Sequence, residues 1–345
     1  MLKDWAPQPD ALLQAFLYDA NSIFYYPYIV CCFLITFGTL YFAQKYSLKD
    51  SIKTMLDKKI WLTKSTLTDM VVTIVYLALF NAPTNLVQAG IMGTTYYFLG
   101  QQLVDMGARE LVTFSMGPLP EAIIACAITM LTFDFATYVA HRIMHKVPML
   151  WDIHLVHHSP ETLNIFSAYR QNPLDRLIRN STAGLFMGIG LAVFHVFFPA
   201  SVMEYKILGV GAGFFFVLFT VHLQHSHVPV HYPKWLQPIL LSPHLHQIHH
   251  SVAERHHDKN FASIFPYWDK MFGTYYDEQL DIKTVKFGLG KEDPIGHKIW
   301  RCYLYPVVNL PNRLQQLWWK RRAANKAVSE PAAHEPPSAS IRPSA

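Results

Sequence analysis

The stretch from His141 to His158 reads HRIMHKVPMLWDIHLVHH and carries its histidines at the spacing of a helix face. His141 and His145 are four residues apart, and His154 precedes His157 and His158 by three and four residues. Side chains at these separations lie on the same side of a helix, so each group can direct its imidazoles toward one metal ion. The stretch therefore predicts helices that carry metal ligands.

A second part of the chain repeats this spacing. Sixteen of the eighteen histidines lie between residues 141 and 257, and downstream of the first stretch the pattern returns as two further groups. Ten histidines in four such groups exceed what one zinc ion needs, and imidazole also suits iron and copper. The pattern therefore predicts a histidine-rich centre with two metal ions. The predicted ligands are His141, His145, His154, His157, His158, His222, His225, His246, His249 and His250.

Four histidines stand apart from these groups, namely His195, His231, His297 and His334. An isolated histidine is usually a hydrogen-bonded core or interface residue, so we expect these four to be structural. The chain also lacks the paired Glu-x-x-His motifs of soluble di-iron bundles, whose carboxylates bridge the metals.

The composition of the 345 residues indicates contact with lipid. Only 15% of the residues are charged, against about 25% in soluble domains, while 51% are hydrophobic and 14% aromatic. Four cysteines without a CxxC pair exclude a disulfide framework and a thiolate zinc site. The net charge of +5 is spread over separate loops, which argues against nucleic acid as a partner.

Long apolar segments predict a multi-pass membrane protein. Residues 24–43 contain no charged side chain and are long enough to cross the hydrocarbon core, and no cleavage site precedes them. We interpret them as an uncleaved signal anchor. The loop 44–68 contains six lysines, so the positive-inside rule places it in the cytoplasm and the N-terminus outside.

The later segments set the side on which the histidines lie. Residues 70–104 are interrupted by Asn81-Ala-Pro83 and could cross the membrane once with a kink or twice as a re-entrant pair. Residues 119–140 predict another span, and 181–203 with 207–221 predict a helical hairpin. One crossing at 70–104 puts the histidines in the cytoplasm, near electron donors, and is the reading that we prefer.

The predicted fold is therefore all-α, a multi-span integral membrane protein with a cytoplasmic, histidine-rich helical cap around two metal ions. We divide the chain into an N-terminal transmembrane region (1–118), a catalytic domain (119–277), a C-terminal interfacial segment (278–322) and a disordered tail (323–345). The interfacial segment ends in Leu317-Trp-Trp-Lys-Arg-Arg322, a composition typical of the membrane surface, and the tail is rich in Pro, Ala and Ser.

Several motifs in order resemble the fatty acid hydroxylase and sterol desaturase superfamily. They are HRIMH at 141–145, LWDIHLVHHS at 150–159, AYRQNPLD at 168–175, and a closing block at 242–275 with a histidine triplet, Asp-x-Asn-aromatic and Trp-Asp-x-x-Phe-Gly-Thr. The resemblance covers about residues 119–277. It implies an integral membrane enzyme that uses two iron ions and O2 to hydroxylate or desaturate a lipid. Zinc could replace the iron in purified protein.

The resemblance assigns ligands motif by motif. His141 and His145 match the first motif, His154, His157 and His158 the second, and His246, His249 and His250 the last. For the third motif His222, His225 and His227 compete, and His225 matches best. His256 and His257 fall in a variable stretch, and Ala262 stands where the family usually has Gly.

Residues that support the ligands can also be predicted. Asp134 is an ionisable group within an apolar span, seven residues before His141 with Tyr138 between them on the same helix face. It could orient a ligand imidazole, or it could pair with Arg142 or Arg170 at the membrane interface. We propose Asp134, Tyr138 and Asn260 as catalytic candidates, and Asp152 and Asp269 as weaker ones.

Other partners and functions follow from what the chain contains. It has neither a nucleotide-binding fingerprint nor a CxxCH haem site, so a separate cytochrome, ferredoxin or reductase must supply electrons to oxidise a lipid taken from the bilayer. A metal transporter would place its ligands near the bilayer midplane, and a zinc hydrolase would need an HExxH-like glutamate. Between the two lipid oxidations we favour hydroxylation over desaturation.

Overall fold

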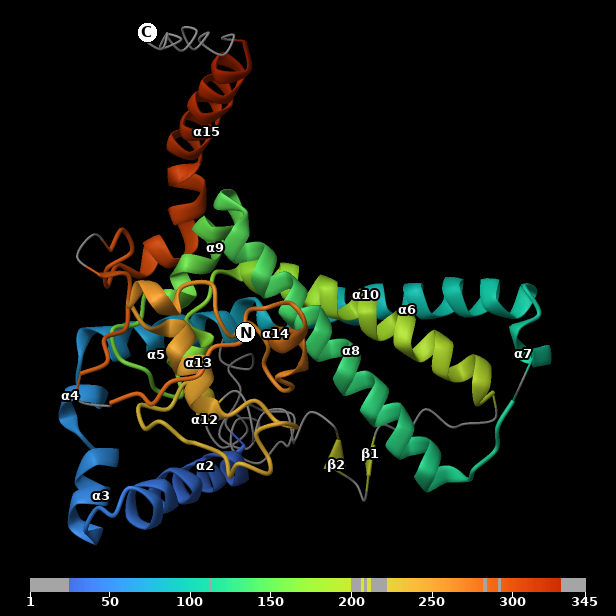
Figure 1. Cartoon of the computed structure of the whole chain (residues 1–345), viewed down its shortest axis with the longest axis horizontal. Helices are drawn as coiled ribbons and strands as arrows, with labels where there is room; N and C mark the ends of the chain where they lie inside the picture. The colour runs from blue at the N-terminus through green and yellow to red at the C-terminus, as the bar shows by residue number, and fades with distance from the viewer. Residues whose placement is uncertain are drawn as a thin grey trace, which may run out of the picture.

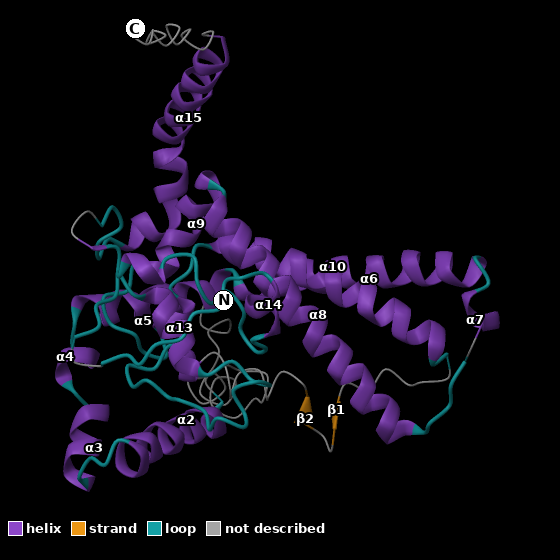
Figure 2. Ribbon diagram, in the orientation of Figure 1, coloured by secondary structure: helices purple, strands orange, loops and turns teal. Residues whose placement is uncertain are grey.

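A computed structural model describes residues 25–111, 113–199, 206–207, 210–211, 222–281, 284–290 and 293–329. In this part of the chain helices dominate, and the strands form a single pair of two residues each (Figure 2). The predicted helical class is confirmed. Figure 1 shows an arm of long helices that extends from a body in which shorter helices and loops are folded together.

The first part of the chain forms α2 to α7. Helix α2 (Tyr26–Gly38) continues into a π-helical turn, η2 (Thr39–Ala43), so the predicted first span is one continuous helical segment of 18 residues. Short helices follow at the level of the body. They are α3 (Leu48–Met55), α4 (Lys58–Trp61) and α5 (Lys64–Leu79). The long helix α6 (Asn81–Asp105) and the short helix α7 (Ala108–Leu111) come next in the chain.

The second part carries the histidine motifs. Its long helices are α8 (Pro118–Lys146), α10 (Pro173–Phe197) and α15 (Ile299–Ser329). A proline in the first turn of α8, α9, α10 and α13 suits a position whose N–H has no helical partner. The shorter elements are α9 (Pro148–His158), η3 (Ser167–Tyr169), β1 (Lys206–Ile207), β2 (Val210–Gly211), α12 (His222–Gln224), α13 (Pro243–His250), η5 (Glu254–His256) and α14 (Tyr267–Met271).

Glycines allow the helices of the arm to approach closely. A Cβ at Gly184 of α10 would lie 2.5 Å from the carbonyl oxygen of Gln88 in α6, and one at Gly190 would lie 2.8 Å from the Thr132 side chain in α8. Small residues at helix contacts of this kind are typical of membrane bundles, because they bring the backbones together. Helices α6, α8 and α10 therefore form a packed three-helix arm (Figure 1).

Pairs along α6 and α10 show that these helices run in the same direction. Near their starts, Asn180 donates to Asn85 over 3.1 Å, and near their ends the rings of His195 and Tyr96 lie 5.7 Å apart. Helix α8 runs the opposite way, since its late residue Phe135 packs on Phe186 in the middle of α10. The chain thus passes along the arm three times, and the C-terminus of α8 returns to the body.

The segment predicted at 70–104 is two helices with a break at Phe80, just before Asn81-Ala-Pro83. Helix α5 belongs to the body, where Arg170 forms a buried ion pair with Asp69 over 3.2 Å. Helix α6 belongs to the arm. Three helices in the described part of the chain are long and apolar enough to cross a membrane, at Tyr26–Ala43, Pro118–Lys146 and Pro173–Phe197. The pair Leu48–Trp61 and Lys64–Leu79, bent by 79°, passes the same test together.

Some predicted boundaries differ from the structure. Helix α10 begins at Pro173, earlier than the predicted 181, because Asn172 caps it by accepting from the Leu174 N–H over 3.0 Å. A helix from 207 is wrong for β1 and β2, which pair antiparallel, while 212–221 lie outside the described residues. Helix α15 continues to Ser329 and includes 323–329 of the predicted tail. Residues 1–24 and 330–345 lie outside the described residues.

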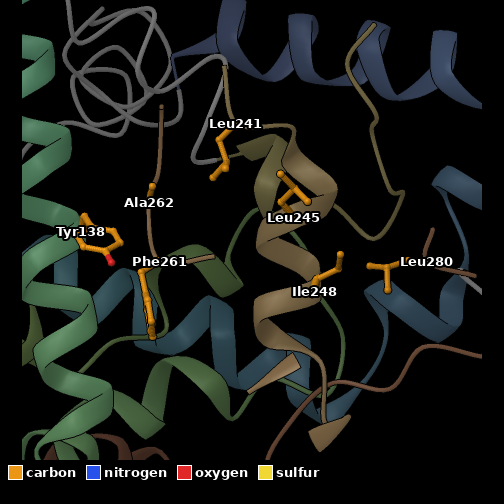
Figure 3. Close-up of a cluster of buried hydrophobic side chains, with 7 residues drawn as sticks. All are labelled: Tyr138, Leu241, Leu245, Ile248, Phe261, Ala262 and Leu280. Carbon is orange, nitrogen blue, oxygen red and sulfur yellow. The ribbon is translucent and has the colours of Figure 1, made fainter. Parts of the chain in front are cut away.

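A hydrophobic core joins α8 to the closing block. Figure 3 shows Tyr138 of α8 beside Phe261 and Ala262, with Leu245 and Ile248 of α13 next to them. All of these side chains are buried. Because the histidines lie on the same helices, this core sets how α8 and α13 face each other. Leu241 and Leu280 complete the cluster.

Candidate metal centre

Nine of the ten predicted ligands gather in two groups within the described part of the chain. In each group one side-chain nitrogen of every histidine lies within 4.8 Å of the others. All but one of these residues are buried, and the exception, His145, is half-buried. The first group is His141, His145, His154, His158 and His249. The second is His157, His225, His246 and His250.

Helix periodicity explains how the two groups share elements. On α9, His154 and His158 are four residues apart and face the first group, whereas the adjacent His157 turns to the second. On α13, His246 and His250 are likewise four apart and face the second group, while His249 faces the first. Helices α9 and α13 therefore each supply both groups, and stacking of His158 on His250, with ring centroids 4.5 Å apart, joins them.

The spacing of the ring nitrogens fits metal ligation. His158 Nε2 lies 3.1 Å from Nε2 of both His145 and His249. In the second group, His225 Nε2 lies 3.4 Å from His157 Nε2 and 3.3 Å from His246 Nε2. Nitrogens about 2.1 Å from one ion at tetrahedral or octahedral angles are separated by about 3.0–3.4 Å. Each group therefore has the dimensions of a metal site.

Backbone and carboxylate acceptors set the tautomers of the first group. Nδ1 of His141 donates to the Phe261 carbonyl over 2.9 Å, and Nδ1 of His249 donates to the Lys259 carbonyl over 2.7 Å. Nδ1 of His154 donates to Asp175 over 2.5 Å. With the proton on Nδ1, the Nε2 lone pair remains for a metal. Nε2 of His141 and of His154 is buried with no hydrogen-bond partner among the described residues.

Burial also keeps these imidazoles neutral, which ligation requires. Desolvation lowers the pKa of His154, and lowers the pKa of His157, His158 and His249 well below the ordinary 6.5. Neighbouring imidazoles add to the effect, because a positive charge on one disfavours a charge on the next. The pKa values of His246 and His250 are lowered in the same way.

The first group has one edge near solvent. Asp258 lies 3.6 Å from Nδ1 of His145 and 2.5 Å from Nζ of Lys146, and its side chain is 42% exposed. The contact with His145, followed by the hydrogen bond from Lys146, holds the pKa of Asp258 below its usual range. Asp258 has φ +59°, a conformation that Asp and Asn tolerate better than most residues.

Asp134 does neither of the two things predicted from the sequence. Its carboxylate accepts from the backbone N–H groups of Ser263, Ile264 and Phe265 over 2.8–3.0 Å, and from the Trp268 indole over 3.0 Å. Both the predicted contact with a ligand imidazole and the predicted pairing with arginine are therefore wrong. Arg142 instead donates to the Tyr138 hydroxyl over 2.9 Å, and Arg170 pairs with Asp69. Asp134 holds the turn that follows Phe261.

Asp269 acts on the same segment. It accepts from the N–H of Phe261 over 2.9 Å and of Ala262 over 3.0 Å, and thus fixes the peptide whose carbonyl receives His141 Nδ1–H. Thr274 donates to Asp269 over 2.7 Å and lies 3.2 Å from the Tyr138 hydroxyl. Asp269 therefore positions a histidine through the backbone, without touching it.

Asn260 and Tyr138 belong to the support as well. Asn260 donates to the carbonyls of Leu245 and Tyr276 and accepts from the Tyr276 N–H, so it joins α13 to the segment after α14. Its φ of +54° suits Asn. Tyr138 is buried in the core of Figure 3. These contacts are with the protein framework, and no contact of either side chain with a grouped histidine is among them.

Two other predictions for this region change. Asp152 accepts two hydrogen bonds from Arg313, over 2.8 and 2.5 Å, so it joins α9 to α15 and does not orient a histidine. Ala262 is buried and takes the place of the expected Gly without strain, because it is not among the residues with positive φ. In the neighbouring turn Gly273 has φ +71°, which a side chain would disfavour.

Asp175 and Asp258 contact grouped histidines and were not predicted from the sequence. Asp175 ends the motif AYRQNPLD, and the only available signal was a carboxylate just inside the start of a helix that follows the histidine motifs. Asp258 begins the Asp-x-Asn motif. Both contact the Nδ1 side of a grouped histidine. The backbone carbonyls of Lys259 and Phe261 carry no sequence signal.

The other histidines take separate places. His222, on α12, is buried but belongs to neither group. His227 Nε2 donates to the Thr54 carbonyl over 3.0 Å. His231 stacks on His244 with ring centroids 3.8 Å apart. His256 lies between Ser251 and Glu278, and His297 lies 3.8 Å from Glu161. His195 lies in the arm, His257 is exposed, and His334 is outside the described residues.

Comparison with known proteins agrees with this site. The fatty acid hydroxylase family model matches residues 126–274, which lie within the predicted catalytic domain and contain all nine grouped histidines. The alkylglycerol monooxygenase of Danio rerio is 31% identical over 212 residues, which are 58% of this chain and 40% of that protein. No solved structure matches.

Two further relatives extend the comparison. The human alkylglycerol monooxygenase is 30% identical over 167 residues, covering 45% of this chain and 31% of that protein. The ornithine lipid hydroxylase of Rhizobium tropici is 27% identical over 147 residues, covering 42% and 39%. The chain thus spans at most 40% of the length of the first curated relatives that it matches. Residues 126–274 of this chain, which contain both histidine groups, are therefore similar to the fatty acid hydroxylase family.

Proposed function

We propose that this protein is a membrane-bound lipid oxygenase that uses two iron ions and O2 to hydroxylate an aliphatic C–H of a fatty acyl chain, a sterol or a related lipid. The observation that carries the proposal is the pair of adjacent, buried imidazole groups with nitrogen spacings of a metal site. Similarity to proteins named monooxygenase and hydroxylase favours hydroxylation over desaturation.

The residues fit such a centre. Nine neutral imidazoles suit iron, and also zinc as a replacement metal in purified protein. Iron bound there would supply activation of O2, the chemistry that an unreactive C–H bond requires and that side-chain acids and bases cannot provide. The protein itself supplies orientation. Asp175 and the Phe261 and Lys259 carbonyls keep protons on Nδ1 of three ligands, so the opposite nitrogens stay free for ligation.

Apolar side chains around the first group would keep water from it. The Phe261 ring lies 5.0–5.6 Å from the rings of His141, His145 and His249. The Trp151 ring lies 4.9 Å from His145 and 5.3 Å from His158. A dry, shaped surrounding of this kind limits side reactions of an activated oxygen species and helps to retain a lipid chain. A separate cytochrome, ferredoxin or reductase would deliver the electrons.

We also infer that α8 and α10 cross the membrane and that the histidine groups lie at its cytoplasmic face. The support is that both helices are long and apolar, and that the grouped histidines lie in the last turns of α8, on α9, and on the segment that follows α10 and includes α13. Helix α6 runs once along the arm beside α10, which favours one crossing for residues 70–104. The lysine-rich segment 44–68 lies at the level of the body, on the side of the histidines (Figure 1).

Elemental analysis tests the centre directly. We expect about two iron atoms per chain in detergent-purified protein from iron-supplied cells. His157→Ala and His249→Ala should abolish metal loading and activity while membrane insertion persists. His297→Ala, a half-buried histidine outside both groups, is the control and should keep its iron. Full iron content in either ligand variant would overturn the ligand assignment.

A second pair of variants separates the competing residues of the third motif. His225→Ala should remove metal from the second group, because His225 Nε2 lies among its ring nitrogens. His222→Ala, three residues away and also buried, should retain the metal. The reverse result would place the third ligand at His222.

Activity is tested by lipid analysis of membranes with and without the protein, supplied with an electron donor and labelled O2. A lipid alcohol that carries the label is the expected product. An alkene without label would identify a desaturase, and turnover that persists after complete loss of iron would exclude the proposed chemistry.

A further inference from the structure

Helix α15 (Ile299–Ser329) leaves the body and runs across the direction of α6 and α10, not along it (Figure 1). Its first half is tied to the body. Arg313 forms a two-armed ion pair with Asp152 of α9, and Asn172, just before α10, donates to the carbonyl of the buried Cys302 over 2.8 Å. Helix α10 is one of the two helices inferred above to cross the membrane, and a helix crosswise to it would lie roughly in the plane of that membrane.

One side of α15 is apolar and uncovered. Residues spaced by three or four positions, with one seven-residue step across Pro311, form a stripe on one side, and each is exposed. Val307 in the middle of the stripe is 62% exposed. The opposite side carries Arg313 and Gln316, which hydrogen-bond each other over 3.0 Å, and faces α9 through Arg313. The stripe consists of Trp300, Leu304, Val307, Val308, Leu314 and Trp318.

The far end of the stripe joins aromatic rings to positive charge. Trp318 and Trp319 pack edge to face with centroids 4.6 Å apart, and the Arg322 guanidinium lies 5.2 and 5.8 Å from them. Lys320 and Arg321 stand beside them, and the described part of the helix from Ile299 to Arg322 contains no acidic residue. Tryptophan with cationic side chains is typical of the headgroup layer of a membrane, and the positive charge complements anionic lipids.

We propose that α15 is a membrane-surface helix that inserts its apolar stripe into the anionic headgroup layer of the membrane crossed by α8 and α10. The proposal concerns lipid binding and does not rest on metal chemistry. Because α15 is bound to α9, and α9 carries His154, His157 and His158, this contact holds the histidine helix at a fixed depth below the bilayer.

The test uses the full chain with Cys31→Ser, since the other native cysteines are buried. A fluorophore sensitive to polarity is attached at Val307→Cys, within the stripe, or at Gln316→Cys, about 180° around the helix. The proteins are reconstituted in phosphatidylcholine vesicles with and without a quarter phosphatidylserine. Quenching is measured with aqueous iodide and with a lipid that carries a nitroxide near the headgroup. Unchanged metal content confirms that both variants are folded.

In vesicles with phosphatidylserine, the label at Val307→Cys should emit at shorter wavelength. It should be quenched about threefold less by iodide than the label at Gln316→Cys, and more by the nitroxide lipid. Adding Lys320→Gln, Arg321→Gln and Arg322→Gln should restore much of the iodide quenching at position 307. Equal iodide quenching at the two positions would overturn the proposal. Protection of position 307 from both quenchers would also overturn it and would indicate a second copy of the chain on the stripe.

Discussion

His154 Nδ1 lies 2.5 Å from Asp175 Oδ2, and neither side chain is exposed. The carboxylate belongs to the first turn of α10, and the imidazole belongs to α9, so this contact links a helix of the arm to a helix of the histidine body. Arg179, four residues along α10, donates to the other carboxylate oxygen over 2.7 Å. Asp175 is thereby fixed from one side and orients His154 on the other.

We therefore expect Asp175→Asn to weaken metal binding by about 10- to 100-fold while the protein remains folded, as is typical when a partner behind a ligand is lost. The measurement is competition with a chelator of known affinity. Asp152→Asn is the matched control. Asp152 is also a buried carboxylate on α9, but it accepts hydrogen bonds from Arg313 and from none of the grouped histidines in the described part of the chain. Equal affinity in wild type and Asp175→Asn would show that His154 needs no carboxylate.

Removal of the Asp134 carboxylate should destabilise the protein. Asp134→Ala leaves the N–H groups of Ser263, Ile264 and Phe265 without their acceptor, and each lost hydrogen bond to a charged group costs about 1.5–3 kcal/mol. We expect a loss of about 3 kcal/mol or more in the free energy of unfolding. Asp134→Asn, which keeps one acceptor oxygen, should lose less. Denaturant unfolding in detergent, followed by tryptophan fluorescence, measures both, and a loss below about 1 kcal/mol in the alanine variant would refute this role.

Two glycines in the arm should respond to alanine with opposite sign. In Gly184→Ala the new methyl group would lie 2.5 Å from the Gln88 carbonyl oxygen, so α6 and α10 must separate at a cost of about 1–3 kcal/mol. In Gly93→Ala no atom outside the neighbouring residues and the local backbone of α6 lies within 4 Å of the new methyl group, and the better helix propensity should stabilise α6 by up to about 1 kcal/mol. Unfolding in detergent at matched concentrations gives both values. Destabilisation of the same size at both positions would mean that close packing is not the cause.

Acid should destabilise the metal-free protein. Burial lowers the pKa of His157, His158 and His250 in the folded state, whereas in the unfolded chain these residues have the ordinary pKa of 6.5. Between the two values the unfolded chain binds more protons, so the free energy of unfolding falls as the pH drops below about 6.5. Above that pH the histidine contribution is constant.

The midpoint of thermal unfolding of chelator-treated protein, measured between about pH 8 and pH 5, checks this expectation. Protonation of carboxylates would lower the free energy of unfolding only at a more acidic pH. The hydrogen bond with Arg255 holds the pKa of Glu278 at about 2, so the stability that Glu278 contributes is complete above its unfolded pKa and is lost only as the pH falls toward 2. A midpoint that stays constant down to pH 5 would argue that the histidines are not buried in the metal-free state.

The sequence was a good guide wherever chemistry follows from local spacing. The four-residue spacing predicted that His154 and His158 on α9, and His246 and His250 on α13, act together, because helix periodicity puts them on one face. The expectation that His157 and His249 join those pairs was wrong, because each faces the other group. The apolar segments predicted the helices at 26–43 and 118–146, because the length and composition of a segment are enough to identify a helix that could cross a membrane. The early start of α10 was not foreseen although its signals, Asn172 as the cap and Pro173 in the first turn, are local. The strands β1 and β2 were not foreseen because strand pairing depends on a partner segment.

The tertiary structure decided how the helices pack against one another and which side chains come into contact. Spacing could not assign His157 and His158 to different metal groups, because that depends on the angle at which α9 packs against α13. It could not give Asp134 its partners, which lie about 130 residues away in the chain. Sequence by itself determined which residue types are present and which share a helix face. Packing determined which carboxylate supports a grouped histidine and which one supports the backbone, because both kinds of contact join elements that are distant in the chain.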